Sequence, residues 1–249
     1  MKKLSRNSNV VIFVVALFVF YLVLIPLQSL VDQTDFKHYQ LNLLQFTPLI
    51  GVLLVSIINR DFTWIKSKKS DLTTIKIGLY LVVPNIILVI VACLVSLILT
   101  KLNQVYVQFN NSPTKIFIIF LITFICCAGE EIGWRKFLYN HFRERNSVFL
   151  SSLFVGIIWS VWHLRLDVVL FIVYFFYITS MSVIISFLFE KSKSLFVIIF
   201  FHSIWNMSAY LFFWERFTVQ LFLLLMSFSI IIALAILLIN RKTIFKKEV

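Results

Sequence analysis

The chain has 249 residues, of which 61% are hydrophobic, and its mean hydropathy is +0.97. A soluble domain is closer to half apolar, so this composition indicates a membrane protein with several spans. The net charge is +12, but the basic residues stand in short clusters between apolar runs, which is typical of topology signals and argues against a nucleic-acid partner.

A spanning helix needs about 20 mostly apolar residues. We therefore predict an all-α fold, a polytopic membrane helical bundle of about eight transmembrane helices, at 10–31, 40–59, 75–100, 116–134, 147–165, 167–189, 194–213 and 217–240. Pro26, Pro48 and Pro84 lie inside these runs, where neighbouring helices can tolerate a kink. Glycine and proline are scarce, so long linkers are not expected and residues 1–249 are predicted to form a single membrane-embedded domain.

The basic residues predict the orientation of these spans. With a cytoplasmic N-terminus, 18 of the 23 Lys and Arg fall on the inner side of the membrane. Cytoplasmic loops carry an excess of Lys and Arg. We therefore expect a multi-pass protein of the cell membrane with both termini in the cytoplasm.

Two adjacent carboxylates interrupt one of the apolar runs. Glu130 and Glu131 lie in a segment that must also span the bilayer, where ionisable residues are costly and mark a functional site by default. Glu131 and Arg135 are four residues apart on one helix face, so we expect them to pair. Glu130 points about 100° away from Glu131 and has no such neighbouring cation, which suits a general base.

Two histidines stand in apolar runs further along the chain. His163 ends the segment WSVWH at 159–163, and His202 lies well inside a predicted span. His202 and Asn206 are four residues apart, so both face one direction. A single intramembrane histidine often makes a helix–helix hydrogen bond, but a histidine and a carboxamide on one face, with a glutamate and a histidine elsewhere, indicate a shared polar site.

These side chains suit hydrolysis. A carboxylate and an imidazole can hold and deprotonate a water, and an imidazole and an amide N–H can stabilise the oxyanion of a tetrahedral intermediate. A carboxylate and two imidazoles can also bind Zn²⁺, whose water then attacks, and the candidate ligands are Glu130, His163 and His202. The residues leave both mechanisms open, with a zinc cofactor or with none.

With these residues in order, the sequence resembles the CPBP family, which comprises the CAAX prenyl endopeptidases and related bacterial bacteriocin-processing and abortive-infection proteins. Three motifs carry the resemblance. The first is two adjacent glutamates followed, after three residues, by an arginine. In the second, three residues separate an aromatic residue from a histidine, and in the third, three residues separate a histidine from an asparagine or aspartate. The chain matches them, with Trp where Phe is usual in the second, as Glu130, Glu131 and Arg135; Trp159 and His163; His202 and Asn206. The resemblance covers about 116–210.

The resemblance implies an intramembrane (metallo)endopeptidase of the CAAX type in the lipid bilayer, acting on a small peptide precursor or a membrane-associated protein. Glu130 and His163 would activate the water, and His202 and Asn206 would form the oxyanion hole. Glu131 and Arg135 would support them. The family is classed as metalloendopeptidases, although a metal-free, glutamate-driven mechanism is also argued.

Two other functions stay open. One is a non-enzymatic immunity or signalling scaffold with the same fold. The other is a proton-coupled transporter, since Glu and His chains also carry protons, but the internal repeat symmetry that many transporters have is not detected.

The predicted boundaries also create a conflict of depth. They place Glu130 near the inner end of one span and His163 near the outer end of the next. A shared site therefore requires tilted or broken helices, or a fifth span that starts deeper.

Overall fold

The structure, a computed structural model, describes residues 5–62, 112–163, 167–213 and 219–246, and the single residues 76, 83, 87 and 90. The predicted span at 75–100 lies outside the described residues, apart from these single positions. Throughout the described ranges the regular structure is helical, with no strand. The fold is the predicted all-α polytopic membrane bundle.

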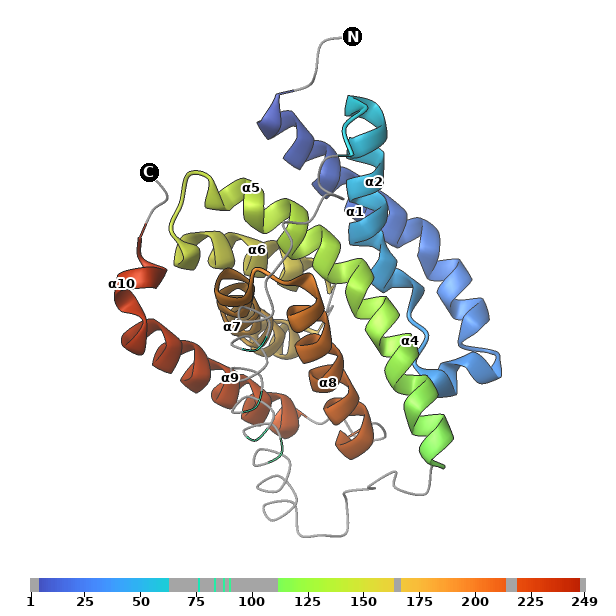
Figure 1. Ribbon diagram of the computed structural model, residues 1–249. Helices are drawn as coiled ribbons and strands as arrows, with labels where there is room; N and C mark the ends of the chain where they lie inside the picture. Colours follow the sequence, from blue (N-terminus) through green and yellow to red (C-terminus); the bar gives the residue numbers. More distant parts are fainter. Residues whose placement is uncertain are drawn as a thin grey trace.

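From α4 onward, the described helices follow one another closely along the chain (Figure 1). The first part contains α1 (Arg6–Val31), two 3₁₀ turns (Asp35–Tyr39 and Leu43–Phe46) and α2 (Thr47–Asn59). The second part contains α4 (Pro113–Glu131), a π-helix (Ile132–Tyr139), α5 (Asn140–Arg143), α6 (Val148–Trp162), α7 (Val168–Ser192), α8 (Leu195–Phe213), α9 (Val219–Ile239) and α10 (Arg241–Ile244).

Short polar side chains begin four of these helices. Ser5, Ser112, Ser147 and Asp167 each accept a hydrogen bond from a backbone N–H in the first turn of α1, α4, α6 and α7. Such N-caps satisfy donors that would otherwise lack a partner. α7 ends at Lys193, whose left-handed backbone (φ 50°) stops the helix.

Two predicted boundaries are wrong. The run at 40–59 is not one helix, because it begins with a 3₁₀ turn and Pro48 stands in the first turn of α2, where it starts the helix rather than kinking it. The helix predicted at 116–134 continues through the π-helix and α5 to Arg143. The prediction ended this helix at the charged residues Arg135 and Lys136, but the helix continues past them.

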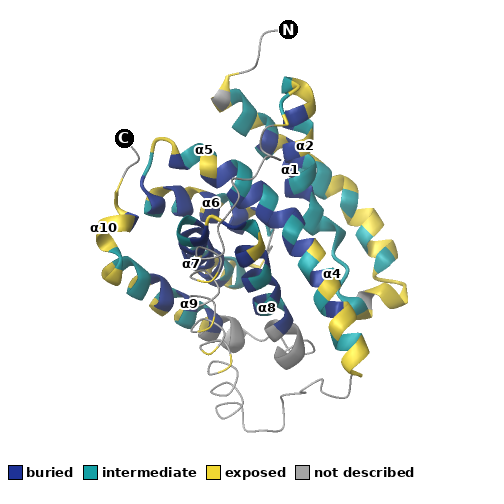
Figure 2. Ribbon diagram, in the orientation of Figure 1, coloured by how far each residue is buried: buried dark blue, intermediate teal, exposed yellow. Residues whose placement is uncertain are grey.

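The outer faces of the helices are apolar, as a lipid environment requires. Three described helices are long and apolar enough to cross a membrane: Asn7–Val31, Pro113–Arg143 and Val168–Ser192. Exposed side chains recur one turn apart, as at Val15, Val19 and Leu22 on α1 and at Leu234 and Leu238 on α9. Figure 2 shows this exposure along the outer sides of α1 and α9, around a buried centre.

The bundle is organised around α7, which packs against α6, α8 and α9, while α4 packs against α8 and α1 against α2. Large rings fill the centre between α6, the π-helix and α1, and the largest fully buried side chains include Trp134, Trp159 and Phe13. α6 and α7 are also bonded directly, since Ser182 on α7 donates to the carbonyl oxygen of Ser152 on α6 at 2.8 Å. The core is therefore tightly packed on the side that contains the carboxylates.

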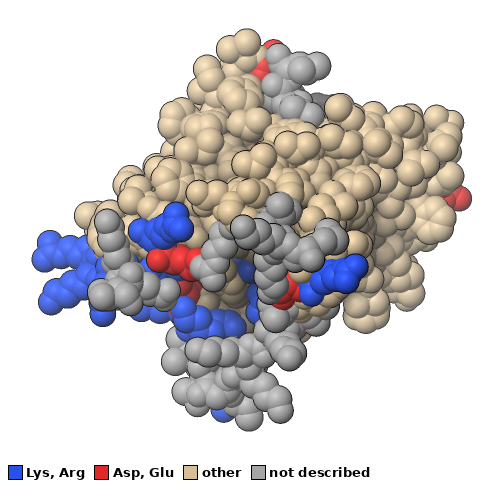
Figure 3. All heavy atoms as spheres, turned by 90° about the horizontal axis from the view of Figure 1, so that it is seen from above, with Lys and Arg blue, Asp and Glu red and all other residues tan. Residues whose placement is uncertain are grey.

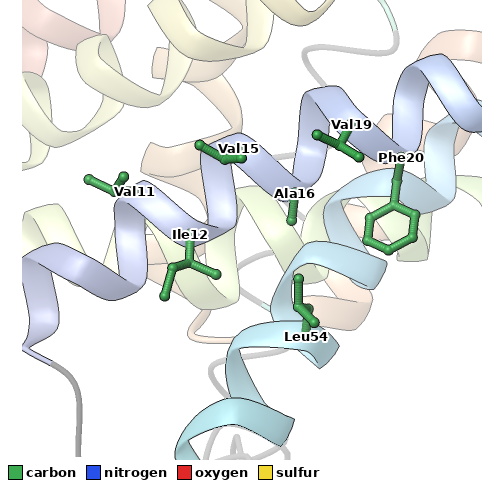
Figure 4. Close-up of a pocket in the computed structure, with 7 residues that line it drawn as sticks. All are labelled: Val11, Ile12, Val15, Ala16, Val19, Phe20 and Leu54. Atoms are coloured by element: carbon green, nitrogen blue, oxygen red, sulfur yellow. The ribbon is translucent and has the colours of Figure 1, made fainter.

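An apolar groove of about 360 Å³ lies on α1 and α2 (Figure 4). Its lining residues are Val11, Ile12, Val15, Ala16, Val19, Phe20 and Leu54. None of the six residues predicted to form the site, all of which the structure describes, lines this groove.

Candidate active site

The two glutamates stand where the long helix changes its winding. α4 is α-helical as far as Glu131, and the next eight residues, Ile132–Tyr139, form a π-helix. Such segments are rare and occur frequently at functional sites. Gly133 in this segment packs on the start of α2 so closely that a Cβ atom would lie 2.2 Å from Cβ of Pro48. The first turn of α2 is therefore held directly against the π-helix.

Glu130 lies deeper in the membrane than its sequence position suggested. The helix continues to Arg143, and α6 begins at Val148 after a short turn. Glu130 stands 13 residues before Arg143 and His163 stands 15 residues after Val148, so both lie at comparable distances along their helices from this turn. The conflict of depth came from ending the fourth span too early, and the two side chains are at similar depths without broken helices.

Glu130 accepts hydrogen bonds from three N–H donors. Its side chain is 2% exposed. Nε2 of Gln45 donates to Oε1 at 2.6 Å, and the indole Nε1 of Trp159 donates to Oε2 at 2.9 Å. Nε1 of Trp134 lies 3.3 Å from the same Oε2. Donors on both oxygens, from the second 3₁₀ turn, α6 and the π-helix, fix the plane of this carboxylate.

Glu131 is held by cationic or imidazole partners instead. The predicted pairing with Arg135 is present, with Nη1 at 3.2 Å from Oε1, and both side chains are fully buried. Nδ1 of His202 lies 2.7 Å from the same oxygen. Glu131 thus joins the end of α4 to α8, and the Arg135 guanidinium lies 4.5 Å from the centre of the Trp159 ring.

His163 follows the last residue of α6 and is oriented by its own helix. Its Nδ1 lies 2.9 Å from the carbonyl oxygen of Trp159. A carbonyl oxygen only accepts, so Nδ1 carries the proton and the neutral ring has its lone pair on Nε2. The ring packs against Trp162 and Tyr174, at 5.0 and 5.3 Å between ring centres. The bond to the carbonyl oxygen therefore fixes the orientation of the ring and, in the neutral ring, its tautomer.

His202 and Asn206 contact successive turns of α4. His202 bonds to Glu131, and Nδ2 of Asn206 lies 3.5 Å from Sγ of Cys127, four residues before Glu131. The two side chains share a face of α8, as predicted. Asn206 lies one helical turn further from the carboxylates than His202 does.

Trp159 connects most of these residues. Besides its bond to Glu130 and its contact with Arg135, its ring centre lies 6.0 Å from that of His163 and 5.4 Å from that of His202. The sequence identified Trp159 only as the aromatic residue of a motif. Its role as a donor to Glu130 was not predicted.

Gln45 and Trp134 were also missed. Trp134 stands four residues after Glu130, so the same spacing argument that paired Glu131 with Arg135 would have found it. Gln45 is 85 residues away along the chain, and only its position as a polar residue in an apolar run singles it out. Such long-range partners depend on how α2 packs against α4.

The three candidate zinc ligands do not form a metal site in this arrangement. Within the described ranges, no group of three or more His, Cys, Asp or Glu side chains could hold a metal ion. Both oxygens of Glu130 face N–H donors, so this carboxylate as placed is turned toward hydrogen bonds rather than toward an ion.

Comparison with known proteins finds two similarities. Residues 112–208 match the family described as Type II CAAX prenyl endopeptidase Rce1-like. A stretch of 58 residues is 34% identical to CAAX prenyl protease 2 of Methanococcus maripaludis, and it covers 23% of this chain and 21% of that protein. The match thus spans about a fifth of this relative's length. All six predicted site residues lie within 112–208, whereas Gln45 lies outside.

Proposed function

We propose that this membrane protein is an intramembrane endopeptidase of the CAAX protease (CPBP) family, because residues 112–208 match the Rce1-like family and a 58-residue stretch is similar to a CAAX prenyl protease. One observation supports this most strongly: the described bundle buries an oriented carboxylate, Glu130, beside two imidazoles at a common tryptophan. We further propose that the whole chain, 1–249, forms one protease domain.

Hydrolysis needs a base that receives the proton of a water. In the proposed mechanism Glu130 takes this proton while the water oxygen bonds to the carbonyl carbon of the peptide. His163 holds the same water through the lone pair on Nε2. The C–N bond then breaks, and the proton on Glu130 passes to the departing amine. The products are a carboxylic acid and an amine, and Glu130 returns as the carboxylate.

The negative oxygen of the tetrahedral intermediate needs donors that are already in place. We propose that His202 and Asn206 supply them from the shared face of α8, with His202 as the imidazolium, because its Nδ1–H bonds to Glu131 and a neutral ring would then have only a lone pair on Nε2. Glu131 and Arg135 position His202, since its Nδ1 bonds to Glu131 and Glu131 bonds to Arg135. The buried pair is thus a support for the imidazole rather than a participant in proton transfer.

The substrate we propose is a small peptide precursor or a membrane-associated protein. A site at the depth of Glu130 requires a substrate that enters the bilayer, since the carboxylate is buried within an apolar bundle. The relative's name specifies a prenylated CAAX protein for that relative, and such a substrate is one member of the proposed class.

The test replaces Glu130 by Gln, which keeps the size of the side chain and removes the base. In cells that express the unmodified chain, the Glu130→Gln variant or a control Glu144→Gln variant, the released peptides are compared by mass spectrometry. Glu144 is exposed in the turn before α6. We expect peptides that depend on the chain to fall about 100-fold or more with Glu130→Gln, and to stay with Glu144→Gln.

Undiminished peptides in the Glu130→Gln cells, at equal amounts of protein, would refute the proposal. A scaffold predicts that this variant keeps the phenotype, and a transporter predicts pH-coupled flux in proteoliposomes. If the proposal holds, the peptides that disappear in the Glu130→Gln cells identify the substrate.

A further inference from the structure

The carboxylate of Glu130 is held from two opposite directions. Gln45 binds Oε1 at 2.6 Å and Trp159 binds Oε2 at 2.9 Å, while Trp134 is a more distant donor at 3.3 Å. A glutamate side chain can otherwise rotate about its terminal bond. One short bond on each oxygen defines the direction of the lone pairs that remain.

The Trp159 indole is suited to this task because its donor cannot move independently of its ring. An indole has one N–H and no acceptor, and its direction follows from the ring plane. The ring is 2% exposed and packs against Trp134, with 6.2 Å between ring centres, and under the Arg135 guanidinium at 4.5 Å. Both neighbours belong to the π-helix that follows Glu130.

The same residue also orients His163. The carbonyl oxygen of Trp159 accepts from Nδ1 of His163 at 2.9 Å. Its side chain and main chain therefore contact two groups that the proposed mechanism uses on one water. A shift of α6 would therefore move both the indole N–H that binds Glu130 and the carbonyl oxygen that binds His163.

We propose that Trp159 is a positioning residue whose indole N–H holds the Glu130 carboxylate in the orientation needed to take a proton from water. This inference rests on the proposed function. The opposing view is that Trp159 only fills space. The Trp159→Phe variant separates the two, because it keeps an aromatic ring and the carbonyl oxygen but removes the N–H.

The matched control is Trp205→Phe. Trp205 is 5% exposed, and its Nε1 donates to the hydroxyl oxygen of Tyr177, so this variant also removes a buried indole donor from the bundle. The ring of Trp205 packs on Phe201 and Tyr177, and its single N–H bonds to Tyr177 rather than to Glu130, Glu131 or either histidine. Both variants should lose stability to a similar degree.

The first measurement does not require a substrate. The chain contains 6 tryptophans, and their indole N–H signals can be observed by NMR in ¹⁵N-tryptophan-labelled protein in detergent micelles and assigned with the Trp→Phe variants. Glu130→Gln replaces a charged acceptor by a neutral amide. We expect the Trp159 signal to move in this variant and the Trp205 signal to stay. A Trp159 signal that stays would overturn the inference.

The second measurement uses a quenched fluorescent peptide with the sequence that the peptidomic comparison identifies. We expect Trp159→Phe to lower kcat about tenfold or more with KM nearly unchanged, because misplacing a catalytic group costs rate rather than substrate binding. Trp205→Phe should keep kcat. Equal kcat for Trp159→Phe and the unmodified chain would overturn the inference while leaving the proposed function intact.

A double variant then tests the shared carboxylate. Gln45→Leu removes the donor on the other oxygen. If both residues act through the orientation of Glu130, the fold-loss of kcat in the double variant will differ from the product of the two single fold-losses. If the two variants only disturb packing independently, the double variant will show that product. If the unmodified chain releases no peptide and cleaves no probe, the proposed function fails, and the kinetic part of the inference fails with it.

Discussion

At the scale of single residues, the two adjacent glutamates are stabilised in different ways. Glu130 receives three neutral N–H donors, whereas Glu131 shares one oxygen between Arg135 and His202. The difference follows from helix geometry, because adjacent side chains point about 100° apart and meet different neighbours. Glu131 faces α8, and Glu130 faces α6 and the turn before α2. Burial of both carboxylates is possible because each is hydrogen-bonded.

Glycines let the start of α2 and the turn before it approach the helix of Glu130, since Gly129 packs on Gln45 and Phe46 and Gly133 packs on Pro48. In Gly133→Ala, the new Cβ atom would lie 2.2 Å from Cβ and 2.9 Å from Cα of Pro48. Backbone atoms must then shift, so we expect a loss of about 1–3 kcal/mol in the free energy of unfolding, as for other overpacked sites. Thermal unfolding in detergent measures this, and activity should fall as Gln45 moves away from Glu130.

Gly51→Ala is the comparison. Its Cβ atom would lie 3.0 Å from Cδ2 of Phe13, which is a side-chain atom and can move more easily than the backbone at Pro48. We therefore predict that Gly133→Ala lowers the free energy of unfolding more than Gly51→Ala does. Equal unfolding temperatures for Gly133→Ala and the unmodified chain would contradict the close contact between the π-helix and α2.

At the scale of the elements, a polar cluster ties the long helix to the end of α7. Glu190 accepts from the hydroxyl of Tyr139 at 3.0 Å, and Arg143 and Lys193 lie 3.5 and 3.0 Å from its Oε1. Tyr139 ends the π-helix and Arg143 ends α5, so both are joined to α7 at one carboxylate. The cluster sets how far the long helix extends beyond Glu130.

Replacing Glu190 by Gln should loosen this junction. The amide keeps the size of the side chain but removes the charge that Arg143 and Lys193 face, so we expect a loss of about 1–3 kcal/mol in the free energy of unfolding. Thermal unfolding in detergent is again the measurement, with the exposed Glu144→Gln as the control. A variant as stable as the control would show that the cluster contributes nothing to the junction.

The same elements show where prediction from the sequence succeeds and where it fails. Apolar runs placed α7 and α9 within a few residues, because a lipid-facing helix is apolar over its whole length. The helix that starts at Pro113 ends nine residues beyond the predicted boundary, because Arg135 is buried in the bundle and does not mark the aqueous phase. A charge is compatible with the interior when a partner neutralises it, and that partner is visible only in the fold.

For the site, local spacing was sufficient for contacts within one helix. It predicted the Glu131–Arg135 pair and the shared face of His202 and Asn206. It could not predict the donors to Glu130 from other elements, since Gln45 and Trp159 are 85 and 29 residues away from it along the chain. Those contacts depend on tertiary packing.

At the scale of the whole molecule, the distribution of charge supports a direction in the membrane. The start of α1, the end of α2 and α5 lie toward the top of Figure 1, and the start of α4 lies at the bottom. Seen from above, Lys and Arg gather over part of this end, and much of the remaining surface is neither acidic nor basic (Figure 3). Because basic loops stay in the cytoplasm, we propose that this end is cytoplasmic, together with both termini.

Cysteine labelling tests this orientation. Single cysteines are introduced at four exposed positions in a chain whose Cys93, Cys126 and Cys127 are replaced by Ala: Asn7 and Glu144 for the cytoplasmic end, Gln33 and Ser112 for the opposite end. A maleimide that cannot cross membranes should label the second pair in intact cells, and the first pair only after the cells are permeabilised. The first 3₁₀ turn, just after Gln33, packs against α4, which begins after Ser112, so these two positions must respond together. Labelling of Asn7→Cys and Glu144→Cys in intact cells would show that the orientation is the reverse of the proposed one, and a different response of Gln33→Cys and Ser112→Cys would contradict the packing of the bundle.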